Sequence, residues 1–522
     1  MRFFNTTGPC NPTNHYMLPP GERLQGAQLH RYVRDELYWM LHAPRQTGKT
    51  TFLISWAREL AALPDVVACY VSVERAQGLV EVERAMPAIC SAIRESAGES
   101  ALPVPALPDA DAASLLSAIL REWAALVAPK ALVVLFDEVD VLAGEAMVSF
   151  LRQLRGGFAK RAPGIFPTSI ALVGMRDLKD YITSAKGGAA PNPGSPFNIK
   201  EDSAVIGNFS KENLAQLFAQ RTAETGQKIE PAALDYAWEQ SRGQPWIVNS
   251  LFKRATLRVL DEDDFSTVTV EHLRAAREQM ILARETHLDS LNYRMNDPRV
   301  CRVMETLLTG GHAPEIVKSD AFQLCQDLGL VALNENGEAT VANPIYREVL
   351  ARHISYGEQL MLPPRNNFRW QAPDGTLDMD SLMREFQKFW RRHSEMWEQK
   401  SDYTEAFPHL LVMAFLQRIT NGGGRIEREY AAGRGRMDMA VEYEGAWNII
   451  EIKIIHDYDP PELVREEGLE QIRGYRDRAA PGAPAYLMIF DRRSEGKKLP
   501  WEQRITWENT GADADGVTVV GC

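Results

Sequence analysis

The sequence has few cysteines and no long apolar run, and both absences exclude classes of protein. No two of its six cysteines form a CxxC pair, so neither a zinc ribbon nor a disulfide framework is expected. No stretch of about 18 apolar residues is present, and the polar residues that follow Phe4 do not form the apolar core of a signal peptide. We therefore expect a cytoplasmic protein with reduced thiols and no membrane span. The cysteines are Cys10, Cys69, Cys90, Cys301, Cys325 and Cys522.

An excess of positive charge is also missing. The chain carries 58 Lys and Arg residues against 70 Asp and Glu residues, a formal net charge of -12. This balance argues against a protein covered in basic residues for constitutive nucleic-acid binding, but it leaves room for a local basic groove. The 45% hydrophobic and 25% charged residues are typical of a globular protein.

The length of 522 residues exceeds what one core organises, so several domains are expected. Apolar runs alternate with helical patterns up to about residue 200, as in βαβ units, and a helical pattern follows. Short helices and a small hairpin then predict a winged helix, and a proline-bearing linker precedes a compact α/β domain. The predicted fold is a multidomain α/β protein, divided into an α/β core (1–208), a helical lid (209–290), a winged helix (291–357), a linker (358–376) and a second compact α/β domain (377–522).

A phosphate-binding loop follows the predicted strand 38–42. In the pattern GxxxxGK[ST], backbone amides wrap the phosphates, the Lys contacts the outer phosphates and the hydroxyl binds Mg²⁺. The first glycine of the pattern is replaced by alanine, which fits if its φ is not strongly positive. The predicted nucleotide-binding residues of the loop are Ala43, Pro44, Arg45, Gln46, Thr47, Gly48, Lys49, Thr50 and Thr51.

A second motif supports the first. The apolar run 131–136 is typical of a strand buried on both faces, and it leads directly into Asp137 and Glu138. In this Walker B arrangement Asp137 holds Mg²⁺ together with Thr50, and Glu138 orients the attacking water. The alternative is a helix start and an acidic strand end that have no relation to each other.

These motifs resemble the P-loop ATPases of the AAA+ and STAND type, over about residues 1–290. Residues 4–6, 8–12 and 15–16 resemble the N-terminal segment of bacterial AAA-like ATPases, which implies that this segment lies against the adenine. Residues 243–245 resemble the lid GxP motif, which implies that Pro245 packs on the base; a helix-capping turn is the alternative. Arg176 follows a strand where the family keeps a nucleotide-sensing residue, and it is either a sensor or finger, or a surface arginine in a salt bridge.

A different set of residues lies near the end of the chain. Asp438 is on one predicted strand, and Glu451 and Lys453 are on the next. Residues two apart on a strand share a face, so Glu451 and Lys453 are expected in one site while Ile450, Ile452 and Ile454 enter the core. Asp438 and Glu451 then hold a divalent ion for phosphodiester hydrolysis, and Lys453 positions water or neutralises charge. The alternative is an ordinary solvent-exposed strand face, because polar and apolar residues alternate there in the same way.

This set resembles the PD-(D/E)XK nuclease superfamily, over about residues 400–493. The resemblance implies a preceding helix that contributes Glu405, and a following helix with Gln471 and Tyr475 four residues apart. Met437 stands where the family name has proline. The resemblance also leaves open a degenerate fold that is retained only for binding.

Together the two ends of the chain predict an ATP-regulated, metal-dependent nuclease. The expected cofactors are ATP and Mg²⁺, with Mn²⁺ as an alternative ion at the nuclease site. The expected partner is nucleic acid, with DNA favoured over RNA, and the chain is expected to form a homo-oligomer and to act in defence against foreign DNA. The alternative is a non-cleaving STAND-type switch that binds DNA or a partner through the winged helix.

Overall fold

The computed structural model describes most of the chain, and the predicted elements can be compared with it over that part. The described residues are 1–25, 29–175, 200–283, 286–308, 316–334, 336–354, 372, 376–398, 408, 411–413, 415–416, 425–432, 435–443, 445–493, 495–496, 499–511 and 516–522. For residues 425–432 and 435–438 only the backbone is described. Most of the predicted linker 358–376 lies outside these ranges, as do Arg176 and Glu405.

The chain divides into two compact units. The first contains residues Met1–Ser290 and Ser319–Tyr346, and the second contains Leu291–Lys318 and Arg347–Cys522. Among the described residues, no helix is long and apolar enough to cross a membrane.

The first unit contains a six-stranded sheet in the order β3-β8-β4-β7-β6-β5. The five strands from β8 to β5 are parallel, and β3 pairs antiparallel with β8 at the edge. Strands β4 and β7 are neighbours in the sheet. After β4 the chain continues to β5 on one side, and after β7 it continues to β8 on the other, so the carboxyl ends of β4 and β7 form a topological switch point. The strands are β3 (Leu24–Gln25), β4 (Tyr38–His42), β5 (Val66–Ser72), β6 (Ala131–Asp137), β7 (Ser169–Gly174) and β8 (Lys200–Ile206).

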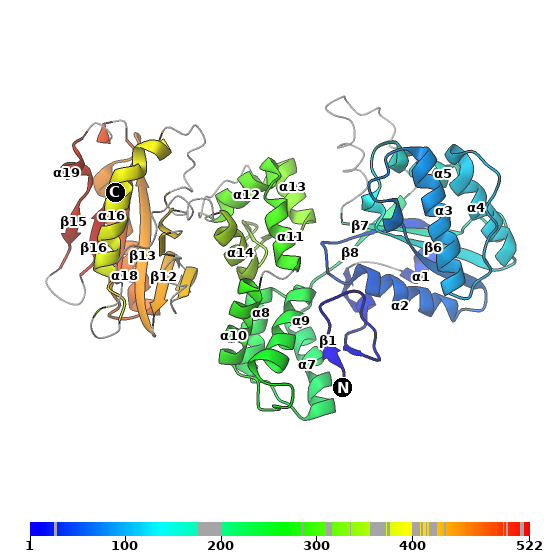
Figure 1. The fold of residues 1–522 in the computed structure, drawn as a ribbon, viewed down its shortest axis with the longest axis horizontal. Helices are drawn as coiled ribbons and strands as arrows, with labels where there is room; N and C mark the ends of the chain where they lie inside the picture. Colours follow the sequence, from blue (N-terminus) through cyan, green and yellow to red (C-terminus); the bar gives the residue numbers. More distant parts are fainter. Residues whose placement is uncertain are drawn as a thin grey trace. The chain divides into compact units, whose positions relative to one another are not determined.

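Helices cover both faces of this sheet (Figure 1). Strand β6 shows why: Val133 and Leu135 enter the core under α1 and α2, whereas Leu132, Val134 and Phe136 enter the core under α3, α4 and α5. This alternation of two apolar faces is what the continuous apolar run predicted. The helices are α1 (Leu29–Arg34), α2 (Lys49–Ala61), α3 (Val82–Glu99), α4 (Ala112–Val127) and α5 (Gly144–Phe158).

Helices α7 to α10 follow the sheet and pack on one another. A capping box of Ser210 and Asn213 starts α7, and Pro231 is the first residue of α8. The N-terminal strands β1 (Phe3–Phe4) and β2 (His15–Tyr16) pack on this group, since Phe4 contacts Phe218 and Phe252. The helices are α7 (Lys211–Thr225), α8 (Pro231–Ser241), α9 (Pro245–Arg254), the π-helical η4 (Ala255–Val259) and α10 (Val270–Leu282).

Short helices and one hairpin occupy residues 286–354. The hairpin pairs β9 (Val331–Leu333) with β10 (Ala339–Val341) in antiparallel register. It follows α13, and both belong to the first unit. The helices are α11 (Thr286–Arg294), α12 (Pro298–Leu308), α13 (Asp320–Asp327) and α14 (Pro344–Ile354), and the short helical turns are η1 (Pro20–Arg23), η2 (Glu74–Ala76), η3 (Val139–Val141) and η5 (Ile316–Lys318).

The second unit contains a mixed sheet in the order β11-β12-β13-β14-β16-β15. Helix α16 packs on one face through residues such as Met383 and Phe386, and α18 packs on the other through Ile472 and Tyr475. The elements are α16 (Met379–Glu398), β11 (Arg425–Ala432), β12 (Gly435–Tyr443), β13 (Ala446–Ile455), α18 (Pro461–Ala479), β14 (Ala485–Asp491), α19 (Trp501–Arg504), β15 (Trp507–Asn509) and β16 (Thr518–Gly521).

Candidate nucleotide and nuclease sites

The predicted phosphate loop joins the carboxyl end of β4 to the start of α2. Ala43 is buried and donates its amide to the carbonyl of Gly174, and its φ is not positive. The turn is instead made by Gln46 (φ 58°) and Gly48 (φ 96°). Alanine is therefore compatible with the first position of the motif, as expected. The first amides of an α-helix have no acceptor within the helix, so those of α2 can point at an anion.

Lys49 is folded against its own loop. Its Nζ donates to the carbonyls of Ala43 at 2.8 Å and Pro44 at 2.9 Å. Burial lowers the pKa of Lys49, while the carboxylates of Asp137 and Asp140 oppose this shift. The ammonium group thus lies beside the loop, and its contact with a phosphate remains a prediction.

Thr50 and Asp137 meet at the switch point of the sheet. The Thr50 hydroxyl donates to Asp137 Oδ2 at 2.7 Å, and Tyr70 donates to the same oxygen at 3.4 Å. The amide of Glu138 donates to Asp137 Oδ1 at 2.9 Å. A hydroxyl and a carboxylate in contact at the end of a phosphate loop form an oxygen donor set that suits Mg²⁺.

Glu138 directly follows this carboxylate in a left-handed conformation, with φ 59° and ψ 31°. Burial raises the pKa of the Glu138 carboxyl, and the neighbouring charge of Asp137 adds to the shift. A non-glycine residue with positive φ is uncommon, and such residues gather at functional sites. Glu138 is thus held where a general base or water-orienting group is expected.

Three residues near this site were not predicted from the sequence. Tyr70 contacts Asp137 from the neighbouring strand β5. The Oδ1 of Asp140 is buried without a hydrogen-bond partner among the described residues, close to Gly174. Arg23 donates to the carbonyl of Thr47 at 2.8 Å. Asp140 had a sequence signal, because it lies two residues after Glu138; the other two depend on contacts between distant segments.

The N-terminal segment contacts both α2, which follows the phosphate loop, and α9, which begins in the GxP motif. The amide of Cys10 donates to the hydroxyl of Thr51 at 3.0 Å, and Trp246 Nε1 donates to the carbonyl of Thr6 at 2.9 Å. Pro245 is the buried first residue of α9, which Gln244 caps by accepting the amide of Ile247. The motif therefore does form a helix-capping turn, and its contact with a base remains a prediction.

The hairpin segment of the first unit also contacts the loop. An ideal Cβ placed on Gly329 would lie 2.6 Å from Cβ of Pro44, and Gly329 has φ +72°. Nearby, His287 Nε2 and the hydroxyl of Tyr346 are 2.6 Å apart, and burial lowers the pKa of His287 to about 4. The residues after α13 thus pack directly on a phosphate-loop side chain.

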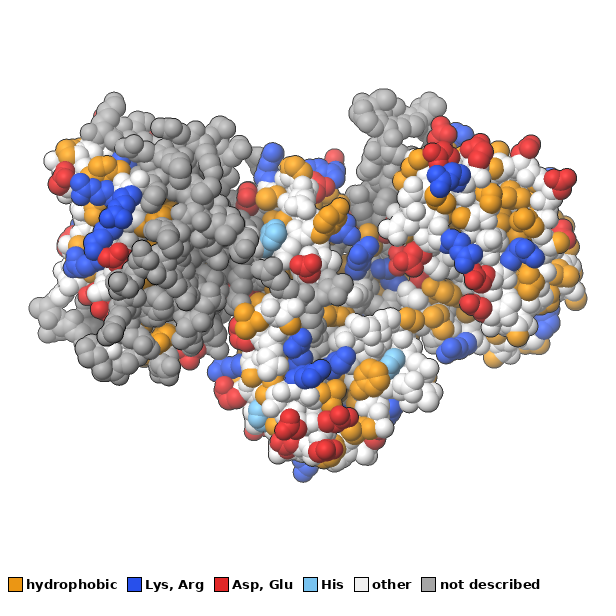
Figure 2. All heavy atoms as spheres, in the orientation of Figure 1, with side chains coloured by type: hydrophobic (Ala, Val, Ile, Leu, Met, Phe, Trp, Pro, Cys, Tyr) orange, Lys and Arg blue, Asp and Glu red, His pale blue; other side chains and the backbone are white. Residues whose placement is uncertain are grey.

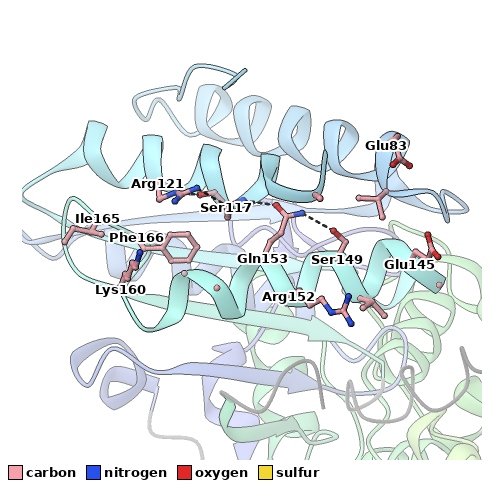
Figure 3. Close-up of a pocket in the computed structure, with 16 residues that line it drawn as sticks. Glu83, Ser117, Arg121, Glu145, Ser149, Arg152, Gln153, Lys160, Ile165 and Phe166 are labelled. Carbon is pink, nitrogen blue, oxygen red and sulfur yellow. Dashed lines mark hydrogen bonds between the residues drawn. The ribbon is translucent and has the colours of Figure 1, made fainter. Parts of the chain in front are cut away.

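A cavity of about 840 Å³ lies elsewhere, between α4 and α5 (Figure 3). Polar side chains that line the cavity are hydrogen-bonded to one another, because Gln153 accepts a hydrogen bond from the amide of Ser117 and donates one to Ser149. The basic side chains on its rim are Arg121, Arg152 and Lys160. None of the lining residues is a predicted site residue, so this cavity is separate from the phosphate loop.

In the second unit, Glu451 and Lys453 form the predicted pair on β13. Lys453 Nζ contacts Glu451 Oε1 at 3.0 Å, and Glu451 is only 3% exposed. Ile450 and Ile452 enter the core under α16, as expected for the alternate residues of the strand. A carboxylate buried this deeply is costly unless it is paired or holds a cation. Lys453 supplies that pairing for Glu451, and the role of Glu451 as a metal ligand remains a prediction.

The neighbouring elements of the predicted motif are described in part. Met439 of β12 pairs with Ile450 of β13 in antiparallel register. Continued by one residue, this register places the backbone of Asp438 opposite that of Glu451. An ideal Cβ on Gly468 of α18 would lie 3.2 Å from Cγ of Lys453. Gln471 follows three residues later on α18 and is exposed. The side chain of Asp438, like the whole of Glu405, lies outside what the structure describes.

An exposed basic stripe runs along α16 in the same unit, where Lys and Arg side chains gather in Figure 2. Arg391 pairs with Glu502 of α19 at 3.3 Å, and the guanidinium of Arg384 lies 3.9 Å from the ring centre of Trp507. This stripe supplies a local positive surface on a chain whose net charge is negative. Its members are Arg384, Lys388, Arg391 and Arg392.

Comparison with known proteins identifies the C-terminal domain. Residues 403–483 match the family model of the PD-(D/E)XK nuclease superfamily, and this range contains every residue predicted for the nuclease motif. No curated protein matches the chain. Together with the phosphate loop on its parallel sheet, the match shows a chain that combines a P-loop ATPase-like fold with a PD-(D/E)XK nuclease domain.

Several solved structures are similar to the chain. A Walker-type ATPase of Pyrococcus abyssi has 13% identity and a TM-score of 0.47, covering 66% of this chain and 99% of that one. The RuvB Holliday junction branch migration motor of Thermotoga maritima has 15% identity and a TM-score of 0.33, covering 62% and 90%. Cdc6p of Pyrobaculum aerophilum has 13% identity and a TM-score of 0.34, covering 61% and 88%.

Proposed function

We propose that this chain is a nuclease whose cutting of DNA is controlled by ATP. The observation that carries the proposal is the presence of two separate groups of candidate site residues in one chain. Thr50 and Asp137 meet at the phosphate loop, and the buried Glu451 lies with Lys453 on a strand of the nuclease domain. The first site suits MgATP, and the second suits a divalent ion on a phosphodiester.

At the nucleotide site, residues 43–51 hold the phosphates, and Glu138 orients the water that attacks the γ-phosphate. Glu138 is suited to this because its raised pKa makes it a better proton acceptor than an exposed glutamate. Arg176 is the proposed sensor and Pro245 the proposed base contact.

At the nuclease site, Asp438 and Glu451 hold a divalent ion, which lowers the pKa of bound water and stabilises charge on the phosphate. Lys453 lies within contact distance of Glu451, so its ammonium can neutralise charge that develops in the transition state. Glu405 is proposed to add a carboxylate, and Gln471 to orient substrate or water. Mg²⁺ is the expected ion, with Mn²⁺ as an alternative.

The proposed substrate is DNA rather than RNA, and the basic stripe on α16 supports contact with a phosphate backbone. A nuclease that cuts without control endangers its own cell, so a nucleotide gate and a role in defence against foreign DNA are proposed together, by analogy with such fusions. We further propose a homo-oligomer in the cytoplasm, with the domain division 1–208, 209–290, 291–357, 358–376 and 377–522.

The test is to incubate the purified chain with linear DNA, circular DNA and RNA, with and without ATP and Mg²⁺ or Mn²⁺. Cutting that requires the divalent ion, changes with ATP and is lost in Glu451→Gln supports the proposal. Glu470→Gln is the matched control, because Glu470 is an exposed acid on α18. If no condition gives divalent-dependent cleavage while ATP still binds, the non-cleaving switch is the better description.

A further inference from the structure

Arg23 joins two segments of the first unit that are far apart in the sequence. Its Nη1 donates to the carbonyl of Thr47 at 2.8 Å and to the carbonyl of Gly207 at 3.0 Å. The amide of Gly207 donates back to the carbonyl of Arg23 at 3.0 Å. One guanidinium nitrogen is therefore shared between the phosphate loop and the residue that follows β8.

The same guanidinium lies against the last glycine of the loop. An ideal Cβ on Gly48 would lie 2.8 Å from Nη2 of Arg23, so only glycine permits this approach. The positive charge is thus close to the N-terminus of α2, where the helix dipole is also positive. The guanidinium of Arg23 and the positive N-terminus of α2 repel each other, and an anion bound on the loop relieves this repulsion.

The charge of Arg23 has no acidic partner in the described part of the chain. Burial lowers its pKa to about 10, which still leaves it protonated at neutral pH, and Cys10 partly opposes this shift. Its Nε is buried with no hydrogen-bond partner among the described residues. A buried guanidinium is usually paired with a carboxylate. Here the anion that would balance it is one bound on the neighbouring loop.

On its other side, Arg23 reaches the helical segment 209–282. Its guanidinium carbon lies 4.8 Å from the ring centre of Phe209. The amide of Phe209 donates to the carbonyl of Gly243 at 2.8 Å, and an ideal Cβ on Gly243 would lie 1.9 Å from the carbonyl oxygen of Phe209. Gly243 immediately precedes Gln244, the cap of α9. The contacts therefore run from the phosphate loop to the start of α9.

We infer that Arg23 is the positioning residue that couples occupancy of the phosphate loop by a nucleotide to the arrangement of helix α9. The inference rests on the proposed binding of ATP at residues 43–51. Phosphates on the loop attract the guanidinium, and Nη1 holds Thr47 and Gly207 together, so a shift of Arg23 moves Phe209 and the turn before α9. Such coupling requires that the nucleotide binds the two arrangements with different affinity.

The test is hydrogen exchange of peptides covering residues 243–259, measured with and without a non-hydrolysable ATP analogue. The wild type should gain protection in these peptides when the analogue binds. Arg23→Ala should still bind the analogue, with an affinity that falls by at most about tenfold, since one charged group is lost from several contacts. Its gain of protection in residues 243–259 should be absent. Arg23→Lys should not restore the gain, because an ammonium lacks the planar fork that stacks on Phe209.

Arg58→Ala is the matched control, since Arg58 is an exposed arginine on α2, and it should respond like the wild type. Phe209→Leu provides a second variant if Arg23→Ala does not fold; it should bind the analogue and lose most of the gain. A full gain of protection in Arg23→Ala or Phe209→Leu overturns the coupling while the binding of ATP stands. A wild type that does not bind the analogue in calorimetry overturns the proposed nucleotide function and the coupling together.

Discussion

The hydroxyl of Thr50 and the carboxylate of Asp137 are hydrogen-bonded at 2.7 Å, although 87 positions separate them in the sequence. The contact exists because α2 begins at the carboxyl end of β4 and Asp137 ends β6, on the same edge of the parallel sheet. It brings together the hydroxyl residue of the GxxxxGK[ST] pattern and the acid of the Walker B strand. The pair is the structural reason to expect bound MgATP.

The first prediction concerns this loop. Lys49→Ala should abolish ATP binding, because Lys49 is the ammonium group folded against the loop carbonyls. Thr50→Ala should weaken binding by at least about tenfold in the presence of Mg²⁺ and less in its absence, because one oxygen ligand is removed. Isothermal titration calorimetry measures both effects. Lys130→Ala, at an exposed lysine before β6, is the control, and unchanged affinity in Lys49→Ala would sink the assignment.

The second prediction concerns Glu138. Glu138→Gln should bind ATP but fail to hydrolyse it, because the amide cannot accept the proton of the attacking water. A stable complex with ATP, detected by gel filtration with labelled nucleotide, is the expected result. Turnover equal to that of the wild type would remove Glu138 from the mechanism.

The third prediction follows from the raised pKa of Glu138. The folded protein binds this proton more tightly than the unfolded chain does, so stability falls as the pH rises from the ordinary value of 4.5 through the raised pKa. Above the raised pKa the destabilisation is fully present. Nucleotide-free Glu138→Gln should therefore melt at a higher temperature than the wild type near pH 8, and the difference should shrink toward pH 5. A difference that is the same at every pH would contradict the burial argument.

Much of the fold could be predicted because its signals are local. The run 131–136 and the acids after it defined a strand buried on both faces, and the loop motif defined the start of α2. Arg23 could not be found in this way, since its partners Thr47 and Gly207 lie 24 and 184 positions away. Nothing in the short sequence around Arg23 distinguishes it from the exposed arginines of α1.

At the nuclease site, too, features with a local sequence signal could be predicted and contacts between distant segments could not. Alternation along β13 correctly placed Glu451 with Lys453 and placed Ile450 and Ile452 in the core. It could not show that α18 approaches Lys453 at Gly468, because that contact depends on how a helix crosses the sheet. The roles of Asp438, Glu405 and Gln471 remain predictions for experiment.

The fourth prediction concerns these nuclease residues. Asp438→Ala and Glu451→Ala should each reduce cleavage by roughly two orders of magnitude or more, because each removes a ligand of the divalent ion. Lys453→Ala should also impair turnover but leave binding of Mn²⁺ largely intact, whereas Gln471→Ala should have a milder effect. Cleavage is followed on labelled DNA, and circular dichroism verifies the fold. If the two acid variants cut as fast as the wild type, the active site lies elsewhere.

The last prediction uses two glycines of the hairpin segment to test whether it packs on the phosphate loop. Gly329 and Gly337 have similar backbone conformations, with φ +72° and φ +78°, but their surroundings differ. A Cβ on Gly329 meets Pro44 at 2.6 Å, whereas a Cβ on Gly337 meets nothing within 4 Å. The backbone strain of an alanine is therefore shared by both positions, and the collision with Pro44 is specific to one.

Gly337→Ala should lower the free energy of unfolding by about 1 kcal/mol, the usual cost of alanine at a positive φ. Gly329→Ala should lower it by about 1–3 kcal/mol more, because Pro44 must move or the contact must open. Only Gly329→Ala should also alter the affinity for ATP, since Pro44 belongs to the phosphate loop. Denaturant unfolding and calorimetry measure the two effects. Equal losses of stability in both variants, with equal ATP affinity, would show that this contact does not constrain the loop in solution.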